Sequence, residues 1–175
     1  MTILLQIISF TFIGPLFVEV GGYFWHRFAE HQGWLGESVR ARHIVHHQED
    51  YPVEALRPAK QKYQSANSWS WYVLALILMA LAYVLFPPKY SLLMIAGGLL
   101  YATFVVSKFH KSFHLQRTWL QRFAWYKKLV KLHDIHHYAP VNYGINFFFM
   151  DRLFGTYQET QPQKALPTFT KPKHA

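Results

Sequence analysis

"WSWYVLALILMALAYVLFPPKYSLLMIAGGLLYATFVVS", residues 69–107, contains two long apolar runs on either side of a pair of prolines. If helical, each run is about 27 Å long, which is sufficient to cross the hydrocarbon core of a bilayer. Pro87 and Pro88 interrupt helical structure, and so short a break forces the two runs into an antiparallel hairpin. The stretch therefore predicts two membrane spans, 69–86 and 90–107. Buried helices of a soluble protein are the alternative.

A third apolar run precedes the hairpin. Residues 3–25 would form a helix about 34 Å long, and Glu19 is the only charged residue within it. No Lys or Arg precedes the run and no small-residue cleavage site follows it, which favours a retained span over a signal peptide. We expect an all-α integral membrane protein with about three transmembrane helices. Its membrane domain would cover residues 1–157, and a polar, proline-bearing tail would cover residues 158–175.

The positive charges are distributed unevenly about these spans. The chain has 18 Lys and Arg against 9 Asp and Glu, and among the 18 only Lys89 lies in the hairpin turn. The positive-inside rule then places residues 26–68 and 108–175 on the cytoplasmic face. Every histidine lies in these two segments, so we expect a cytoplasmic helical cap rich in histidine. This placement argues against nucleic-acid binding, and it fits a bacterial inner membrane or the endoplasmic reticulum.

Residues 115–132 have apolar positions at helical spacing opposite basic ones. The pattern predicts a helix. Such a helix would lie along the membrane surface or pack on the cytoplasmic body.

Ten of the 11 histidines form four groups, and only His174 stands apart. Two groups begin where a span ends, and the other two lie in the cytoplasmic segments that follow, so all ten can meet at the membrane surface. A histidine-rich surface or a pH-sensing cluster is the alternative to a metal site. The groups are "HRFAEH" (His26, His31), "HIVHH" (His43, His46, His47), "HKSFH" (His110, His114) and "HDIHH" (His133, His136, His137).

The spacing within the groups suits metal binding to different degrees. His110 and His114 project from one face of a helix, the usual helical two-histidine arrangement. The three histidines of "HDIHH" fall within a wedge of about 100°. His26 and His31 lie about 140° apart on an ideal helix, so they require a distorted or ending helix, or they serve different ions.

The number of histidines indicates two ions. The chain has no cysteine, so the ligands must be nitrogen or oxygen. Ten imidazoles exceed one centre, and two four-coordinate zinc sites would use at most about eight. Two ions with about five nitrogens each and an open position suit iron and dioxygen chemistry, although zinc can load in its place.

Four acidic residues lie near the histidine groups. Glu30, Asp134 and Asp151 are candidates to hold the outer ring nitrogen of a ligand histidine, or they are solvated surface acids. Glu19 lies two helical turns before His26 on the same face, inside the first span. It is either a functional cavity residue or a hydrogen-bond partner of a neighbouring helix.

The four boxes and their order resemble the membrane fatty acid hydroxylase and sterol desaturase superfamily. The resemblance covers about residues 20–157 and includes "HHQEDYPVEALRP" and "NYGINFFFMDRLFGT". It implies that the ten boxed histidines hold two iron ions. It also implies supporting roles beside the metals, or only capping and packing of the last helix, for Asn142, Tyr143, Asn146 and Asp151. The fatty acid 2-hydroxylase branch looks most similar, but this chain has three predicted spans rather than four and no fused haem domain.

The resemblance implies that the protein hydroxylates a C–H bond of a lipid, a fatty acyl chain or a sterol-like molecule, with dioxygen and two external electrons. Desaturation of the same substrate and non-catalytic metal binding are the alternatives. No flavin, haem or nicotinamide motif is visible, so the electrons would come from a separate ferredoxin or b-type cytochrome with its reductase. The basic face suits an acidic donor, or anionic lipid headgroups. A transporter would need more polar spans, and a zinc hydrolase would need fewer ligands.

Overall fold

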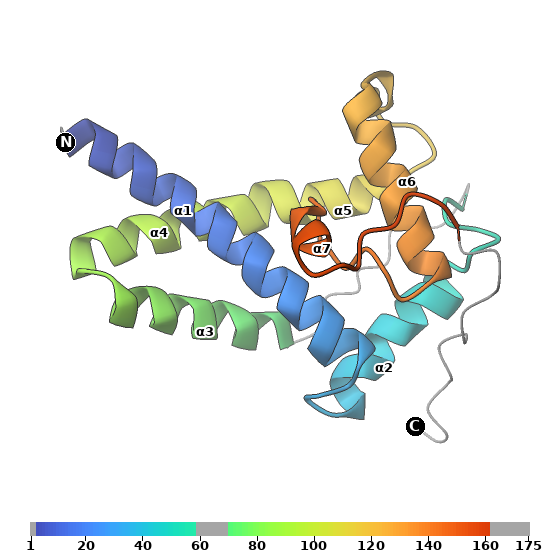
Figure 1. The fold of residues 1–175 in the computed structure, drawn as a ribbon, viewed down its shortest axis with the longest axis horizontal. Helices are drawn as coiled ribbons and strands as arrows, with labels where there is room; N and C mark the ends of the chain where they lie inside the picture. The colour runs from blue at the N-terminus through green and yellow to red at the C-terminus, as the bar shows by residue number, and fades with distance from the viewer. Residues whose placement is uncertain (1–2, 59–69, 162–175) are drawn as a thin grey trace.

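The computed structural model describes residues 3–58 and 70–161, and within these residues the chain forms helices joined by turns (Figure 1). This confirms the expected all-α fold. The helices are α1 (Ile3–Phe24), α2 (Glu37–Val45), α3 (Ser70–Leu85), α4 (Pro88–Tyr101), α5 (Ser107–Phe113), α6 (Ala124–Tyr138) and α7 (Phe149–Leu153). Three π-helical turns, η1 (Trp25–His31), η2 (His46–Asp50) and η3 (Ala102–Val106), and one 3₁₀ turn, η4 (Trp119–Arg122), complete them.

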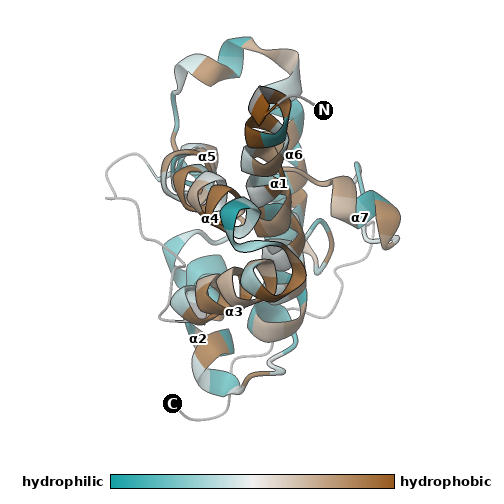
Figure 2. Ribbon diagram, turned by 90° about the vertical axis from the view of Figure 1, so that its left-hand side faces the viewer, coloured by the Kyte–Doolittle hydropathy of each residue, from teal (hydrophilic) through white to brown (hydrophobic). Residues whose placement is uncertain are grey.

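Two continuous helical rods dominate the fold. One runs from α1 through η1 to His31, and the other runs from α4 through η3 and α5 to Phe113. In the part of the chain that the structure describes, these two are long and apolar enough to cross a membrane, whereas α3 is apolar but shorter. Figure 2 shows that apolar residues concentrate on α1, α3 and α4. Many of them are exposed, as Phe12 and Val84 are, which suits contact with lipid.

The predicted hairpin is present between α3 and α4. Pro88 opens α4, where its missing N–H costs no helical hydrogen bond. The Ser91 hydroxyl donates back across the turn to the carbonyl oxygen of Ala82 at 2.8 Å. The turn is therefore braced from inside the hairpin.

Helix α1 packs most extensively against α4, and glycines make the crossing possible. A Cβ at Gly14 would overlap the Met94 carbonyl oxygen, and a Cβ at Gly97 would overlap the Thr11 carbonyl oxygen. Pro15, next to Gly14 in α1, has no backbone N–H, so the helix lacks one hydrogen-bond donor beside this crossing. The two backbones thus approach more closely than side chains would allow.

The helix expected over residues 115–132 is present only in its second half. Residues 115–118 are not helical, η4 is a single turn, and Phe123 is extended with ψ of 132° before α6 begins at Ala124. The chain turns here, and α6 runs across the direction of α5 (Figure 1). The Tyr126 hydroxyl donates to Ser112 Oγ at 2.6 Å and ties α6 to α5. Leu115 and Trp119, two of the apolar positions in that pattern, are exposed.

The first residue of the predicted tail, Gln158, is hydrogen-bonded to the helical body of the protein. The Gln158 amide donates to Asn142 Oδ1 at 2.8 Å, and the Asn142 amide donates to the Gln158 carbonyl at 2.8 Å. Residues 162–175, and with them His174, lie outside the described residues, as do residues 59–69 of the segment before α3.

Candidate metal centre

Four helical segments bring the ten boxed histidines together at one end of the two rods. η1 carries the first pair, α2 and η2 carry the next three, α5 and the residue after it carry the third group, and α6 carries the last. Nine of the ten side chains are buried, and His110 is half-buried. Geometrically they divide into two sets of five that touch each other.

The first set is held together by its Nε2 atoms. His43 Nε2 lies 3.0 Å from His26 Nε2, 2.9 Å from His31 Nε2 and 2.9 Å from His47 Nε2. His31 Nε2 lies 3.2 Å from His26 Nε2 and 3.2 Å from His136 Nε2. Imidazole nitrogens bound about 2.1 Å from one ion are about 3 Å apart when they are neighbours around it. We call this set the first cluster: His26, His31, His43, His47 and His136.

The outer ring nitrogens show why a cation fits the first cluster. His26 Nδ1 donates to the Tyr143 carbonyl at 2.7 Å, and His136 Nδ1 donates to the Val141 carbonyl at 2.7 Å. A carbonyl only accepts, so in the neutral rings Nε2 carries a lone pair and no hydrogen. Both lone pairs lie within 3.2 Å of His31 Nε2, whose single possible hydrogen can satisfy only one of them. A metal ion among the Nε2 atoms would satisfy all five.

The remaining five histidines form a second cluster from η2, α5 with the residue after it, and α6. His133 is central, with ring centroids 4.8 Å from His110, 4.7 Å from His114 and 4.7 Å from His137. Among the described residues, the Nε2 atoms of His110, His133 and His137 have no hydrogen-bond partner although they are buried. Unpaired buried nitrogens on converging rings suit a bound ion. The second cluster is His46, His110, His114, His133 and His137.

The clusters are adjacent. The rings of His47 and His137 stack with centroids 4.1 Å apart, and one belongs to each cluster. His46 and His47, and likewise His136 and His137, are neighbours in the sequence that point to different clusters. Each HH pair therefore contributes to both.

A π-helical turn explains how His26 and His31 reach the same cluster. In such a turn residue i bonds to residue i+5, so residues five apart lie nearly above one another. η1 spans Trp25–His31, and the two rings lie 4.8 Å apart by their centroids. The distorted helix that the spacing required is thus present, and of the two alternatives the shared cluster is the one observed.

Burial keeps the imidazoles in the form that binds metal. It lowers the pKa of His136 to about 4, and it lowers the pKa of His43 and His133 well below the usual range, with further lowering from neighbouring imidazoles. At neutral pH these rings are neutral. Neutral imidazole is the ligand form of histidine.

Backbone carbonyls, more than acids, hold the outer nitrogens. His137 Nδ1 donates to the Tyr51 carbonyl at 3.1 Å, and His114 Nδ1 donates to the Leu56 carbonyl at 3.1 Å. Sequence reasoning missed these partners because every residue has a carbonyl. Tyr51 and Leu56 both lie in "HHQEDYPVEALRP", a segment that the family resemblance includes, and this was the only sign of them in the sequence.

Of the acids considered from the sequence, Glu30 alone approaches a histidine ring. Glu30 is 1% exposed, lies with Oε2 3.6 Å from His43 Nδ1, and accepts a hydrogen bond from Trp71 Nε1 at 2.9 Å. Asp134 instead pairs with Arg57 at 2.6 Å. Trp71 was not anticipated from the sequence.

The remaining candidates brace the segment between α6 and α7. Asp151 accepts hydrogen bonds from the backbone amides of Tyr143 at 2.7 Å and Gly144 at 2.8 Å. Asn146 donates to Glu19 at 3.0 Å, and the Tyr101 hydroxyl donates to the same carboxylate. These contacts hold the Tyr143 carbonyl against His26. Asn142, with φ of +54°, joins the segment to α6 by donating to the Leu132 carbonyl at 3.1 Å.

Comparison with known families agrees with this geometry. The family model described as fatty acid hydroxylase matches residues 11–156, which include all ten clustered histidines. The chain belongs to the fatty acid hydroxylase family. No curated protein and no solved structure matches it.

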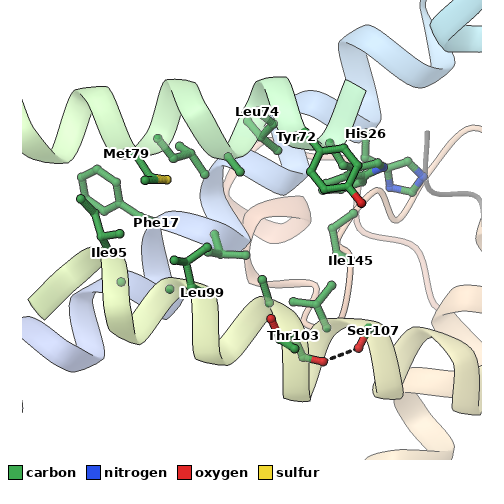
Figure 3. Close-up of a pocket in the computed structure, with 18 of the residues that line it drawn as sticks. Phe17, His26, Tyr72, Leu74, Met79, Ile95, Leu99, Thr103, Ser107 and Ile145 are labelled. Carbon is green, nitrogen blue, oxygen red and sulfur yellow. Dashed lines mark hydrogen bonds between the residues drawn. The ribbon is translucent and has the colours of Figure 1, made fainter. Parts of the chain in front are cut away.

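In this fatty acid hydroxylase family member, a cavity of about 460 Å³ adjoins both clusters. Its walls are the facing sides of α1, α3 and the α4–α5 rod, and Figure 3 shows it extending from His26 toward Phe17 and Met79. His26 and His43 of the first cluster and His110 of the second line it. Its size is that of a small-molecule site, and apolar side chains form most of the wall.

Proposed function

We propose that this protein is a membrane-bound non-haem di-iron oxygenase that hydroxylates a C–H bond of a lipid. The observation that carries the proposal is the meeting of two five-histidine clusters at one end of a single apolar cavity. A bilayer lipid is the substrate class that such a cavity among exposed apolar helices would admit. A fatty acyl chain and a sterol-like skeleton both belong to it.

The first and second clusters would each hold one iron ion, and zinc can take the same ligands. Five nitrogens leave one position of a six-coordinate ion open, which suits iron. When bound, the ions supply dioxygen activation for attack on an unactivated C–H bond. One oxygen atom enters the C–H bond, and the other leaves as water with two electrons and two protons from outside.

The chain's own residues prepare this reaction by orientation and exclusion of water. The carbonyls of Tyr143 and Val141 fix the rings of His26 and His136, so the ligand nitrogens need no rearrangement to bind. The apolar wall would hold the lipid carbon against the histidine end and keep water away. Substrate position then decides between hydroxylation and desaturation.

The proposal also includes an orientation in the membrane and an electron donor. Three spans, with α3 as the shortest, would place both clusters on the cytoplasmic face of a bacterial inner membrane or the endoplasmic reticulum. A ferredoxin or a b-type cytochrome with its reductase would supply the electrons. The basic residues that follow the spans, among them Lys108 and Lys111, favour an acidic donor.

Oxygen-18 incorporation tests the function. We expect purified, iron-loaded protein with a chemical reductant and mixed lipids to form an alcohol that contains one labelled oxygen atom. The His136→Ala variant should form none, and the His174→Ala variant should match the parent. A new double bond without label would identify a desaturase. Neither product, with two metal ions bound, would contradict the oxygenase function and favour a metal-binding role.

A further inference from the structure

The cavity has a polar end and an apolar end. At the histidine end its wall includes Glu30 and three hydroxyl side chains, Tyr72, Thr103 and Ser107. All three hydroxyl residues are exposed, Tyr72 by 77%. Figure 3 shows Tyr72, Thr103 and Ser107 on the His26 side of the cavity. We call these three residues the hydroxyl rim.

The opposite end is bounded by side chains without polar groups. Figure 3 shows Phe17, Met79 and Ile95 together there, from α1, α3 and α4. A ligand with a polar head and an apolar body has only one favourable orientation in such a cavity. Its head lies at the hydroxyl rim, and its body extends toward Phe17.

Phe17 rests on an aromatic support. Its ring contacts Phe86 edge-on at 6.2 Å, Phe86 contacts Phe10 at 6.1 Å, and Phe10 stacks on Tyr90 at 4.1 Å. The hairpin turn that carries Phe86 is braced by Ser91. Phe17 alone among these four aromatic residues lines the cavity. It therefore forms a supported floor that a ligand cannot easily displace.

We propose that the cavity binds one unbranched hydrocarbon chain with its polar head at the hydroxyl rim, and that Phe17 limits the length of chain that fits. The rim and the histidine clusters lie at the same end. The carbon that faces the clusters is therefore set by its distance from the head, whatever the length of the chain. This second consequence rests on the proposed function, whereas the length limit does not.

Chain binding tests the length limit without catalysis. The probes are radiolabelled unbranched saturated fatty acids of increasing length, bound to the metal-loaded protein in one detergent, with affinities referred to free aqueous fatty acid. Affinity should rise about fourfold per methylene group while the chain still finds apolar wall. It should stop rising when the chain reaches Phe17, and this break defines the limit.

Variants should move the break in opposite directions. Phe17→Ala should shift it to longer chains, and Phe17→Leu should do so less and serves if the alanine variant does not fold. Ala75→Leu, which adds bulk to the α3 wall, should shift it to shorter chains. Phe12→Ala is the matched control, because Phe12 lies on the same helix, is 72% exposed and does not line the cavity. A break that stays in place in Phe17→Ala and Phe17→Leu, or moves equally in Phe12→Ala, overturns the length limit.

Product analysis separates this inference from the proposed function. Across the chain series, the oxidised carbon should keep its number counted from the head, in the parent and in Phe17→Ala. A position that is constant from the methyl end would overturn the orientation. If the break moves as expected but no chain is oxidised, the proposed function fails and the length limit stands.

Discussion

At the scale of single residues, part of the first cluster is oriented for metal binding before an ion is present, because outer ring nitrogens are already engaged. Tyr143 and Val141 offer carbonyls to two rings of the first cluster, and Glu30 lies beside a third, that of His43. The two carbonyl hydrogen bonds fix the tautomers and ring directions of His26 and His136. Their Nε2 atoms point inward, where one cation would satisfy the nitrogens of the first cluster together.

Removing the Glu30 carboxylate should weaken metal binding. Glu30→Ala leaves Trp71 Nε1 without its acceptor and removes the carboxyl group beside His43. We expect a loss of about 10 to 100 fold in metal affinity, measured by competition with a chelator. Glu37→Ala is the control, because its side chain is 64% exposed and pairs only with Arg40 among the described residues. Equal affinities of the two variants would show that Glu30 does not support the cluster.

Acid should destabilise the protein through His136. Burial lowers the pKa of His136 from 6.5 to about 4. Between these values the unfolded chain binds a proton that the folded chain does not, so the free energy of unfolding falls as the pH falls. The thermal midpoint of metal-free protein should drop between about pH 7 and about pH 5, and drop less in His136→Gln. A thermal midpoint that rises as the pH falls over this range would contradict the lowered pKa of His136.

At the scale of elements, departures from the regular α-helix place the site. The π-helical η1 brings His26 and His31 into one cluster, and η2 begins with the HH pair His46 and His47. η1 and η2 each end a longer helix, whereas the third π-helical turn, η3, lies within the second rod. The crossing of α1 and α4 fixes the cavity wall in turn, because Gly14 and Gly97 let the backbones touch.

Filling the crossing should destabilise the fold. Gly97→Ala places a methyl group on the Thr11 carbonyl oxygen and should cost about 1 to 3 kcal/mol, the usual range for overpacking. The adjacent Gly98→Ala is the matched control, because its Cβ would lie 3.4 Å from the Gly14 carbonyl oxygen, an ordinary contact. Thermal unfolding in one detergent compares them. A Gly98→Ala midpoint as low as that of Gly97→Ala would contradict the crossing geometry.

At the scale of the whole molecule, an apolar bundle of α1, α3 and the α4–α5 rod is capped by α2, its following turn η2, and α6, which bring six of the ten clustered histidines. The cap closes the bundle at the point where the cavity meets both clusters (Figure 1, Figure 3). A lipid chain would enter beside the ligands. The arrangement thereby joins membrane access and metal binding in a single domain.

Sequence alone predicted the parts that depend on composition and spacing. The hairpin followed from Pro87 and Pro88, and the division into two sets of five followed from counting imidazoles. Sequence did not predict the glycine crossing or the carbonyls of Tyr51 and Val141, because backbone approach has no side-chain signature. The start of α6 was also misplaced. The apolar period of residues 115–132 continues across Thr118 and Phe123, whose extended backbones lie where the chain turns between α5 and α6.

Metal content per chain tests the central claim most directly. Elemental mass spectrometry on detergent-purified protein should find about two ions per chain, one for each cluster. His136→Ala removes an imidazole from the first cluster, and His137→Ala removes one from the second. Each variant should lower the metal content by about one ion per chain, and the double variant should retain almost none. His174→Ala should bind as the parent does. A content well below one ion that none of these variants changes, in protein that keeps its helical circular dichroism, would contradict the two-metal centre.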